Sequence, residues 1–102
     1  MSKFSLFGKF TVQAGEQNTM VEILLEAAES MADLEECEIY LVSISENEPD
    51  TVYVYEVWSN KEAHQASLTL EATQKLIQCA KPIITGMERI GTLKTMGGKG
   101  VS

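Results

Sequence analysis

The chain is poor in histidine, cysteine and basic residues, and each shortage excludes a class of protein. Its 102 residues include one His and two Cys, Cys37 and Cys79, and its 8 Lys and Arg face 15 Asp and Glu, for a formal net charge of −7. One His cannot make a His-rich metal site, and two Cys without metal-ligand spacing are expected to be small core residues. The negative charge gives no attraction for phosphate backbones, so we expect no nucleic acid partner.

Several targeting and binding signals are also missing. Residues 1–5 contain no long apolar run and no small-residue cleavage site, and no segment approaches the length of a bilayer-spanning helix. These absences predict a cytoplasmic protein with no membrane partner. The motifs G-x-G-x-x-G, G-x-x-x-x-G-K-[ST] and G-x-S-x-G are absent as well. Dinucleotide, nucleoside triphosphate and hydrolase functions therefore lose support, and we expect no metal site.

The chain does have enough apolar sequence, 44% hydrophobic residues, for the core of one small domain. Residues 4–12 alternate between two faces, which is typical of a strand. After Gly15, apolar residues recur with helical spacing as far as about Asp33, and Thr19 with Glu22 is placed to form a capping box. A strand followed by an amphipathic helix is therefore predicted.

Four further segments have strand character or turn character. Residues 38–44 and 51–58 are β-branched and aromatic runs separated by a turn-rich segment, and they predict an antiparallel hairpin. Residues 87–96 alternate again and predict a last strand. Residues 97–102 are rich in glycine and predict a flexible tail, which is no phosphate loop because no helix follows it.

The segment between the hairpin and the last strand predicts helix. Ser59 is a predicted N-cap with Glu62 three residues later, while Trp58 and Ala63 occupy the positions of a hydrophobic staple. The apolar stripe then loses its phase, which predicts a break near residues 69–71 and two shorter helices. Pro82 closes the helical region.

The element order β, α, β, β, α, β predicts a single α+β domain over residues 1–96. This order is that of the ferredoxin-like split βαβ plan, in which both helical segments lie on one face of a four-stranded antiparallel sheet. In the two middle strands, however, both faces carry large apolar or aromatic residues, whereas a solvated second face should be polar. We therefore expect a homodimer formed through the sheet face, the alternative being a monomer with exposed aromatics.

One stretch of sequence indicates a family. The run from Val54 to His64, VYEVWSNKEAH, resembles the E-x-W-x-x-x-x-A-x signature of the antibiotic biosynthesis monooxygenase (ABM) domain family. The resemblance implies a dimeric α+β barrel. It also implies oxygenation of phenols or quinols without metal or flavin, as in the quinol monooxygenase type, although other members degrade haem or have no known reaction.

The chain departs from the family pattern at several positions. Many members have further histidines on the second helix, where this chain has Ser67 and Glu71. Members that degrade haem pair an Asn on the first strand with the Trp and a His, and residues 4–12 contain no Asn. Haem binding or degradation is therefore the less favoured branch.

The same run contains the candidate catalytic residues His64, Trp58 and Asn60. A neutral imidazole at His64 would accept a phenolic proton, with a solvated surface His as the alternative. Trp58 would stack on a planar ligand, with a core or staple role as the alternative. Asn60 lies next to both in sequence and would donate or accept a hydrogen bond.

The candidate substrate-binding residues are Glu56, Arg89, Tyr40 and Tyr53. Glu56 lies on an apolar strand face, so a buried carboxylate there needs a partner, and Arg89 on the last strand is the expected one, as a structural ion pair. Tyr40 and Tyr53 would line either a pocket or the dimer interface.

Two functions of different classes follow. The first is a cofactor-independent monooxygenase that oxidises a small phenolic or quinol-type aromatic molecule with dioxygen. The second is a non-catalytic module that binds or senses a small aromatic ligand in the same pocket, since a fold does not fix a function.

Overall fold

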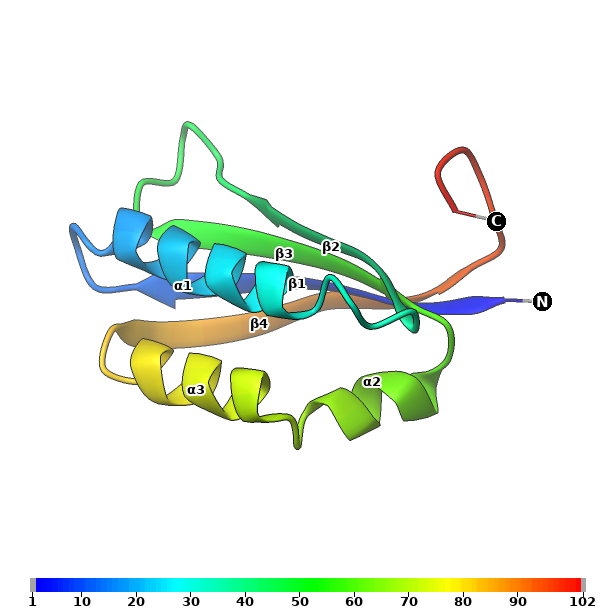
Figure 1. The fold of residues 1–102 in the computed structure, drawn as a ribbon. Helices are drawn as coiled ribbons and strands as arrows, with labels where there is room; N and C mark the ends of the chain where they lie inside the picture. The colour runs from blue at the N-terminus through cyan, green and yellow to red at the C-terminus, as the bar shows by residue number, and fades with distance from the viewer. Residues whose placement is uncertain (1, 102) are drawn as a thin grey trace.

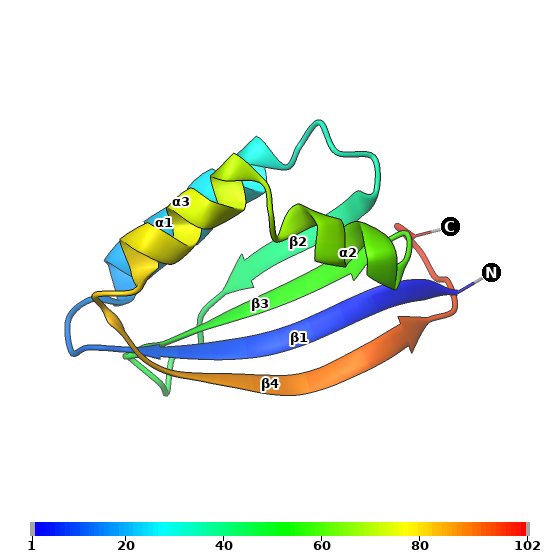
Figure 2. The ribbon, with the colours of Figure 1, turned by 90° about the horizontal axis from the view of Figure 1, so that it is seen from below.

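In the computed structural model, which describes residues 2–101, a four-stranded antiparallel sheet carries three helices on one face (Figures 1 and 2). The strand order is β2-β3-β1-β4. This is the ferredoxin-like α+β fold that the element order predicts. The elements in chain order are β1 (Lys3–Val12), α1 (Gln17–Ser30), β2 (Cys37–Ser43), β3 (Thr51–Trp58), α2 (Lys61–Ser67), α3 (Glu71–Ala80) and β4 (Ile84–Thr95).

The core lies between the sheet and the helices α1 and α3. Alternation puts Phe4, Leu6, Gly8 and Phe10 of β1 on the helix-covered face, opposite Trp58, Glu56, Val54 and Val52 of β3. Side chains from this face and from the helices form one buried apolar cluster, and its removal from water is the main force that holds the layers together. The fully buried members are Val12, Met20, Leu24, Val52, Val54 and Ala80.

The first helix starts differently from the prediction. Glu16 is the N-cap of α1 and makes no side-chain capping bond, so the predicted capping box of Thr19 and Glu22 does not form. Thr19 already lies within the first turn of the helix, where its backbone is helical and it cannot act as a cap. The helix ends at Ser30, a few residues before the predicted end near Asp33.

The second helix begins one residue later than predicted. Its N-cap is Asn60, which has an extended backbone and whose side-chain Oδ1 accepts the N–H of Ala63 at 2.7 Å. Ser59 instead donates its backbone N–H to the carbonyl of Glu36 at 2.8 Å, which ties the end of β3 to the loop before β2. The predicted break is confirmed, because α2 ends at Ser67 and α3 begins at Glu71.

Strand β4 departs from the strict alternation that its sequence predicts. Phe7 of β1 pairs with Gly91 and the next residue, Gly8, pairs with Arg89, so Ile90 is an extra residue in a β-bulge. Arg89 therefore lies on the helix-covered face, while Leu93, three pairs further on, lies on the outer face opposite Ser5. A bulge is not visible in a pattern of apolar and polar residues.

The outer face of the sheet carries an apolar patch beside the polar Ser5, Lys9 and Thr11 of β1. Phe7 stacks on Tyr53, with ring centroids 5.8 Å apart, and meets Tyr55 edge-on at 6.2 Å. Leu41 and Leu93 flank this group and are 55% and 52% exposed. The register thus confirms that both faces of the sheet carry large side chains.

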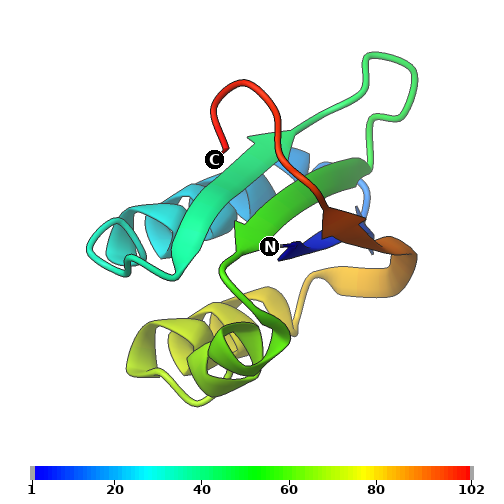
Figure 3. The ribbon, with the colours of Figure 1, turned by 90° about the vertical axis from the view of Figure 1, so that its right-hand side faces the viewer.

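The glycine-rich end of the chain curls back on the side of the sheet away from the helices (Figure 3). Gly98 pairs with Val101 in an isolated bridge, and Val101 is buried. The flexibility predicted for residues 97–102 stays a prediction, and Ser102 lies outside the described residues. None of the helices within residues 2–101 combines the length and the apolar character needed to cross a membrane.

Candidate functional site

A cavity of about 520 Å³ opens between the sheet and the helices α2 and α3. Most of its wall is apolar, and the side chains include Phe10, Met20, Leu76, Ile77, Ile84 and Met87. Four predicted site residues, Tyr40, Glu56, His64 and Arg89, also line it. The volume lies within the range of small-molecule sites, which are mostly apolar with a few polar groups.

Gly8 contributes to the open space above the sheet. It occupies a helix-facing position of β1, between Val54 of β3 and Arg89 of β4. A Cβ at this position would have one neighbour within 4 Å, the carbonyl oxygen of Glu88 at 3.7 Å. A Cβ at Gly8 therefore has room on the helix-covered face of the sheet, next to Arg89 of the cavity lining.

Glu56 is the acidic group of the cavity. Its side chain is 19% exposed, and its Oε1 accepts the indole N–H of Trp58 at 2.9 Å. Burial raises the pKa of Glu56 above its ordinary value, while the bond from Trp58 and the charge of Arg89 act in the opposite direction. The indole thus supplies the partner that a buried carboxylate needs.

His64 projects from α2 toward the same carboxylate. Its Nε2 lies 4.0 Å from Oε1 of Glu56, and its side chain is 12% exposed. The imidazole is packed between aromatic rings, 5.5 Å from that of Phe4 and 5.6 Å, edge-on, from that of Trp58. Burial lowers the pKa of His64 and Arg89 adds to this, so the neutral ring is favoured at neutral pH and its contact with Glu56 is then no ion pair.

Tyr40 and Arg89 complete the polar lining. Tyr40 pairs with Glu56 across β2 and β3, and burial raises the pKa of its phenol, which therefore stays protonated. Arg89 is exposed at the cavity rim. The predicted ion pair of Arg89 with Glu56 is wrong, because no ion pair joins them in the described chain and Trp58 fills that role.

The structure does not bring the other three predicted site residues into this cavity. Trp58 is 1% exposed and faces a smaller depression of about 180 Å³ beside α2. Asn60 uses its side-chain oxygen to cap α2 and lines a different depression, of about 330 Å³. Tyr53 lies on the outer face of the sheet, where its hydroxyl donates to Glu48.

Sequence reasoning missed three polar residues of the cavity. Ser67 is buried at the end of α2 and donates its hydroxyl to the carbonyl of His64 at 2.6 Å. Thr73 is buried in α3 and donates to the carbonyl of Ser67 at 2.7 Å. Lys81 follows α3 at the rim. For Lys81 the available signal was a cation directly before the helix-ending Pro82.

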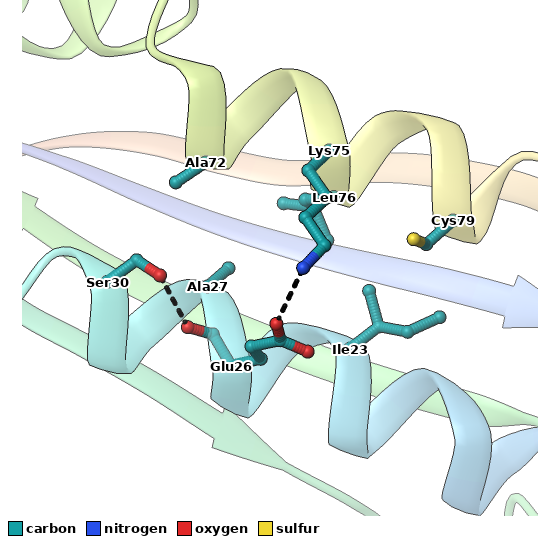
Figure 4. A pocket seen from close by; sticks show the side chains of 8 residues that line it. All are labelled: Ile23, Glu26, Ala27, Ser30, Ala72, Lys75, Leu76 and Cys79. Atoms are coloured by element: carbon teal, nitrogen blue, oxygen red, sulfur yellow. Dashed lines mark hydrogen bonds and ion pairs between the residues drawn. The ribbon is translucent and has the colours of Figure 1, made fainter.

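Another depression, between α1 and α3, is much smaller at about 80 Å³. Lys75 of α3 reaches across it to Glu26 of α1, with Nζ and Oε1 3.1 Å apart (Figure 4). Both side chains are well exposed, so this pair adds little stability. Within residues 2–101, no three His, Cys, Asp or Glu side chains are grouped to hold a metal ion.

Comparisons with known proteins agree with this architecture. A protein from Chloroflexus aurantiacus with the family name antibiotic biosynthesis monooxygenase is 31% identical, with a TM-score of 0.88 over 98% of this chain and 99% of that one. A Deinococcus radiodurans protein with the same family name is 20% identical, with a TM-score of 0.76 over 97% of this chain and 96% of that one. A conserved Methanosarcina mazei protein shares the fold at 12% identity, with a TM-score of 0.82 over 93% and 94% of the two chains.

The fold and these likenesses define a small α+β domain of the ferredoxin-like class. The sequence profile of the antibiotic biosynthesis monooxygenase family matches residues 4–78, which include β1 to β3, α2 and most of α3. The chain belongs to the antibiotic biosynthesis monooxygenase family. No curated protein matches it.

Proposed function

We propose that this chain is a cofactor-independent monooxygenase that oxidises a small phenolic or quinol-type aromatic molecule with dioxygen. The observation that carries the proposal is the meeting of His64 and Glu56, 4.0 Å apart, in the wall of a largely apolar cavity. Membership of the family supports a reaction of this kind.

The cavity suits a planar apolar substrate. Phe10, Leu76 and Ile84 offer apolar surface on the sheet and helix sides, and burial of an aromatic ring against them is favourable. The polar groups are few, so they would fix the orientation of the substrate. A phenolic hydroxyl directed at His64 would lie beside the only buried acid–base pair of the cavity.

His64 would act as the general base. A neutral imidazole accepts the phenolic proton, and the imidazolium that forms is stabilised by the carboxylate of Glu56. The phenolate then donates electrons to dioxygen. In the overall reaction the substrate loses two hydrogen atoms and gains one oxygen atom, and the second oxygen atom leaves as water with those two hydrogens.

The second candidate is a binding or sensing module without turnover. It is favoured by the position of Trp58, whose N–H already donates to Glu56 and whose ring lies outside the cavity. Without Trp58 in contact with the ligand, the cavity would hold an aromatic molecule chiefly by apolar contact. Binding without oxygen consumption is the outcome that this candidate predicts.

The proposal includes a homodimer. The apolar outer face of the sheet would pack against the same face of a second copy, which is an isologous arrangement. Such packing would cover Phe7, Leu41 and Tyr55, whose exposure is otherwise unfavourable. It would leave the helix-covered face and its cavity within each subunit.

Oxygen uptake with a panel of hydroquinones and anthrone-type phenols, without added metal or flavin, tests the proposal. Uptake above the buffer rate that is lost in His64→Gln and kept in Gln65→Ala, an exposed neighbour on α2, would support the monooxygenase. Saturable binding of a panel member with uptake at the buffer rate would instead support the binding module.

A further inference from the structure

Two of the eight basic residues lie at the rim of the cavity. Lys81 follows the C-terminal end of α3, and Arg89 comes from β4, so two separate parts of the chain bring cations to the lining of one cavity. Both side chains are exposed. In a chain with a formal charge of −7, cations gathered at the rim of an apolar cavity are a distinct electrostatic feature.

Within residues 2–101, neither cation forms an ion pair with an acid. Lys3, Lys9 and Lys75 form ion pairs with glutamates, whereas Lys81 and Arg89 form none among residues 2–101. The only acid that lines the cavity is Glu56, and its carboxylate already accepts the N–H of Trp58. The rim therefore has positive charge that is free for an anion.

The surroundings of these cations are apolar. Leu68, Ile77 and Met87 line the same cavity and are exposed. A ligand that contacts both the apolar lining and the cations must combine an apolar body with an anionic group at one end. Such a ligand would place its ring toward His64 and its anion in the solvent-exposed rim, where an anion keeps part of its hydration.

We propose that Lys81 and Arg89 form an anion-binding rim and that the ligand of the cavity is an aromatic carboxylic acid. The planar guanidinium of Arg89 matches a carboxylate with two parallel hydrogen bonds, and Lys81 adds a second positive charge. This inference rests on the proposed use of the cavity for an aromatic ligand. It does not depend on whether that ligand is oxidised.

Calorimetric titration of the full chain with 1-naphthol and with 1-hydroxy-2-naphthoic acid tests the rim. Because charge-assisted hydrogen bonds are worth more than neutral ones, the acid should bind about tenfold more tightly than the phenol at low salt. Added salt should reduce this preference, since the rim is exposed to solvent. Equal affinities for the two probes, or binding of neither, would overturn the proposal.

Variants assign the effect to the two residues. Arg89→Gln with Lys81→Gln should bring the ratio of the two affinities to about one, whereas Arg89→Lys should keep part of the preference for the acid. Lys75→Gln removes a cation outside this cavity and should change nothing. A preference that persists in the double variant would contradict the rim. Preferential binding of the acid without oxygen uptake would sustain the rim and contradict the monooxygenase.

Discussion

The indole of Trp58 donates its N–H to the carboxylate of Glu56, with Nε1 2.9 Å from Oε1. The two residues lie two positions apart on one face of β3, so the strand itself sets their separation. Glu56 lines the cavity and Trp58 does not. The tryptophan therefore acts on the site through the carboxylate that it holds.

The first prediction concerns this hydrogen bond. Trp58→Phe keeps a buried aromatic ring but removes the donor, so Glu56 loses its partner and the free energy of unfolding should fall by about 1–3 kcal/mol. Urea denaturation measures the change. In the Glu56→Gln background the same substitution should lower the free energy of unfolding by less, because a neutral amide tolerates the loss of the indole donor better than a carboxylate does. Equal decreases in the two backgrounds would show that Trp58 and Glu56 are not energetically coupled.

The second prediction is a pH dependence of stability. Burial raises the pKa of Glu56, so the folded state favours the protonated acid. The stability that this protonation gives the folded state is present below the pKa of Glu56 in the unfolded chain. It is lost as the pH rises through the raised pKa of Glu56 in the folded chain. Glu56→Gln should therefore gain stability relative to the natural chain as pH rises from 4 to 7. Thermal unfolding across this range checks it. Glu29→Gln on the exposed side of α1 serves as the control. A difference in stability between Glu56→Gln and the natural chain that does not change with pH would contradict the prediction.

The third prediction separates capping from catalysis at Asn60. Asn60→Ala removes the acceptor for the N–H of Ala63 and should cost about 1 kcal/mol of stability, while Asn60→Asp should restore most of it. Because the Asn60 side chain does not line the cavity, both variants should bind a cavity ligand like the natural chain. Denaturant unfolding and calorimetry measure the two effects. Loss of binding by folded Asn60→Asp would place Asn60 in the site.

The fourth prediction uses the free space above Gly8. The series Gly8→Ala, Gly8→Val and Gly8→Leu should reduce the affinity for an aromatic ligand in that order, because each larger side chain takes more of the cavity. Circular dichroism should show a folded sheet throughout, since the added Cβ meets only one atom within 4 Å. An unchanged affinity for the folded Gly8→Leu variant would mean that ligands bind elsewhere.

The fifth prediction concerns the outer face. Leu41→Glu places a charge in the apolar patch and should convert the proposed homodimer to a monomer at micromolar concentration, because burial of an unpaired charge is costly. Sedimentation velocity measures the mass. Leu25→Glu is the matched control, an exposed leucine of α1 on the opposite side of the molecule. A monomeric natural chain at every accessible concentration would contradict the dimer itself.

Element order and the faces of the strand residues followed from the sequence because they depend on periodicity. The alternation in residues 51–58 put Val52 and Glu56 on one face and Tyr53 on the other, and the structure agrees. The start of α2 was missed by one residue, since Ser59 and Asn60 are both good N-caps and the contact with Glu36 decides between them. That contact joins residues 23 positions apart, which no local pattern reveals.

The site was predictable only where one strand or one helix sets the geometry. Glu56 and His64 were identified from a single run of sequence, and the structure brings them together. The partner of Glu56 was mistaken because charge complementarity favoured Arg89, whereas the nearer donor was the neutral indole two residues away. Lys81 was overlooked because its position at the rim depends on how α3 returns to the sheet.

The bulge at Ile90 decides which face each later residue of β4 occupies. If Ile90 instead took a place in the ladder, every later position of the strand would turn over, so that Leu93 would face the helices and Lys94 the outer side. Ser5 would then lose Thr95, its hydroxyl partner. A relative that lacks the extra residue reaches the same faces with a regular ladder, so an alignment that places a gap opposite Ile90 compares residues from the same face, and an alignment without the gap compares residues from opposite faces.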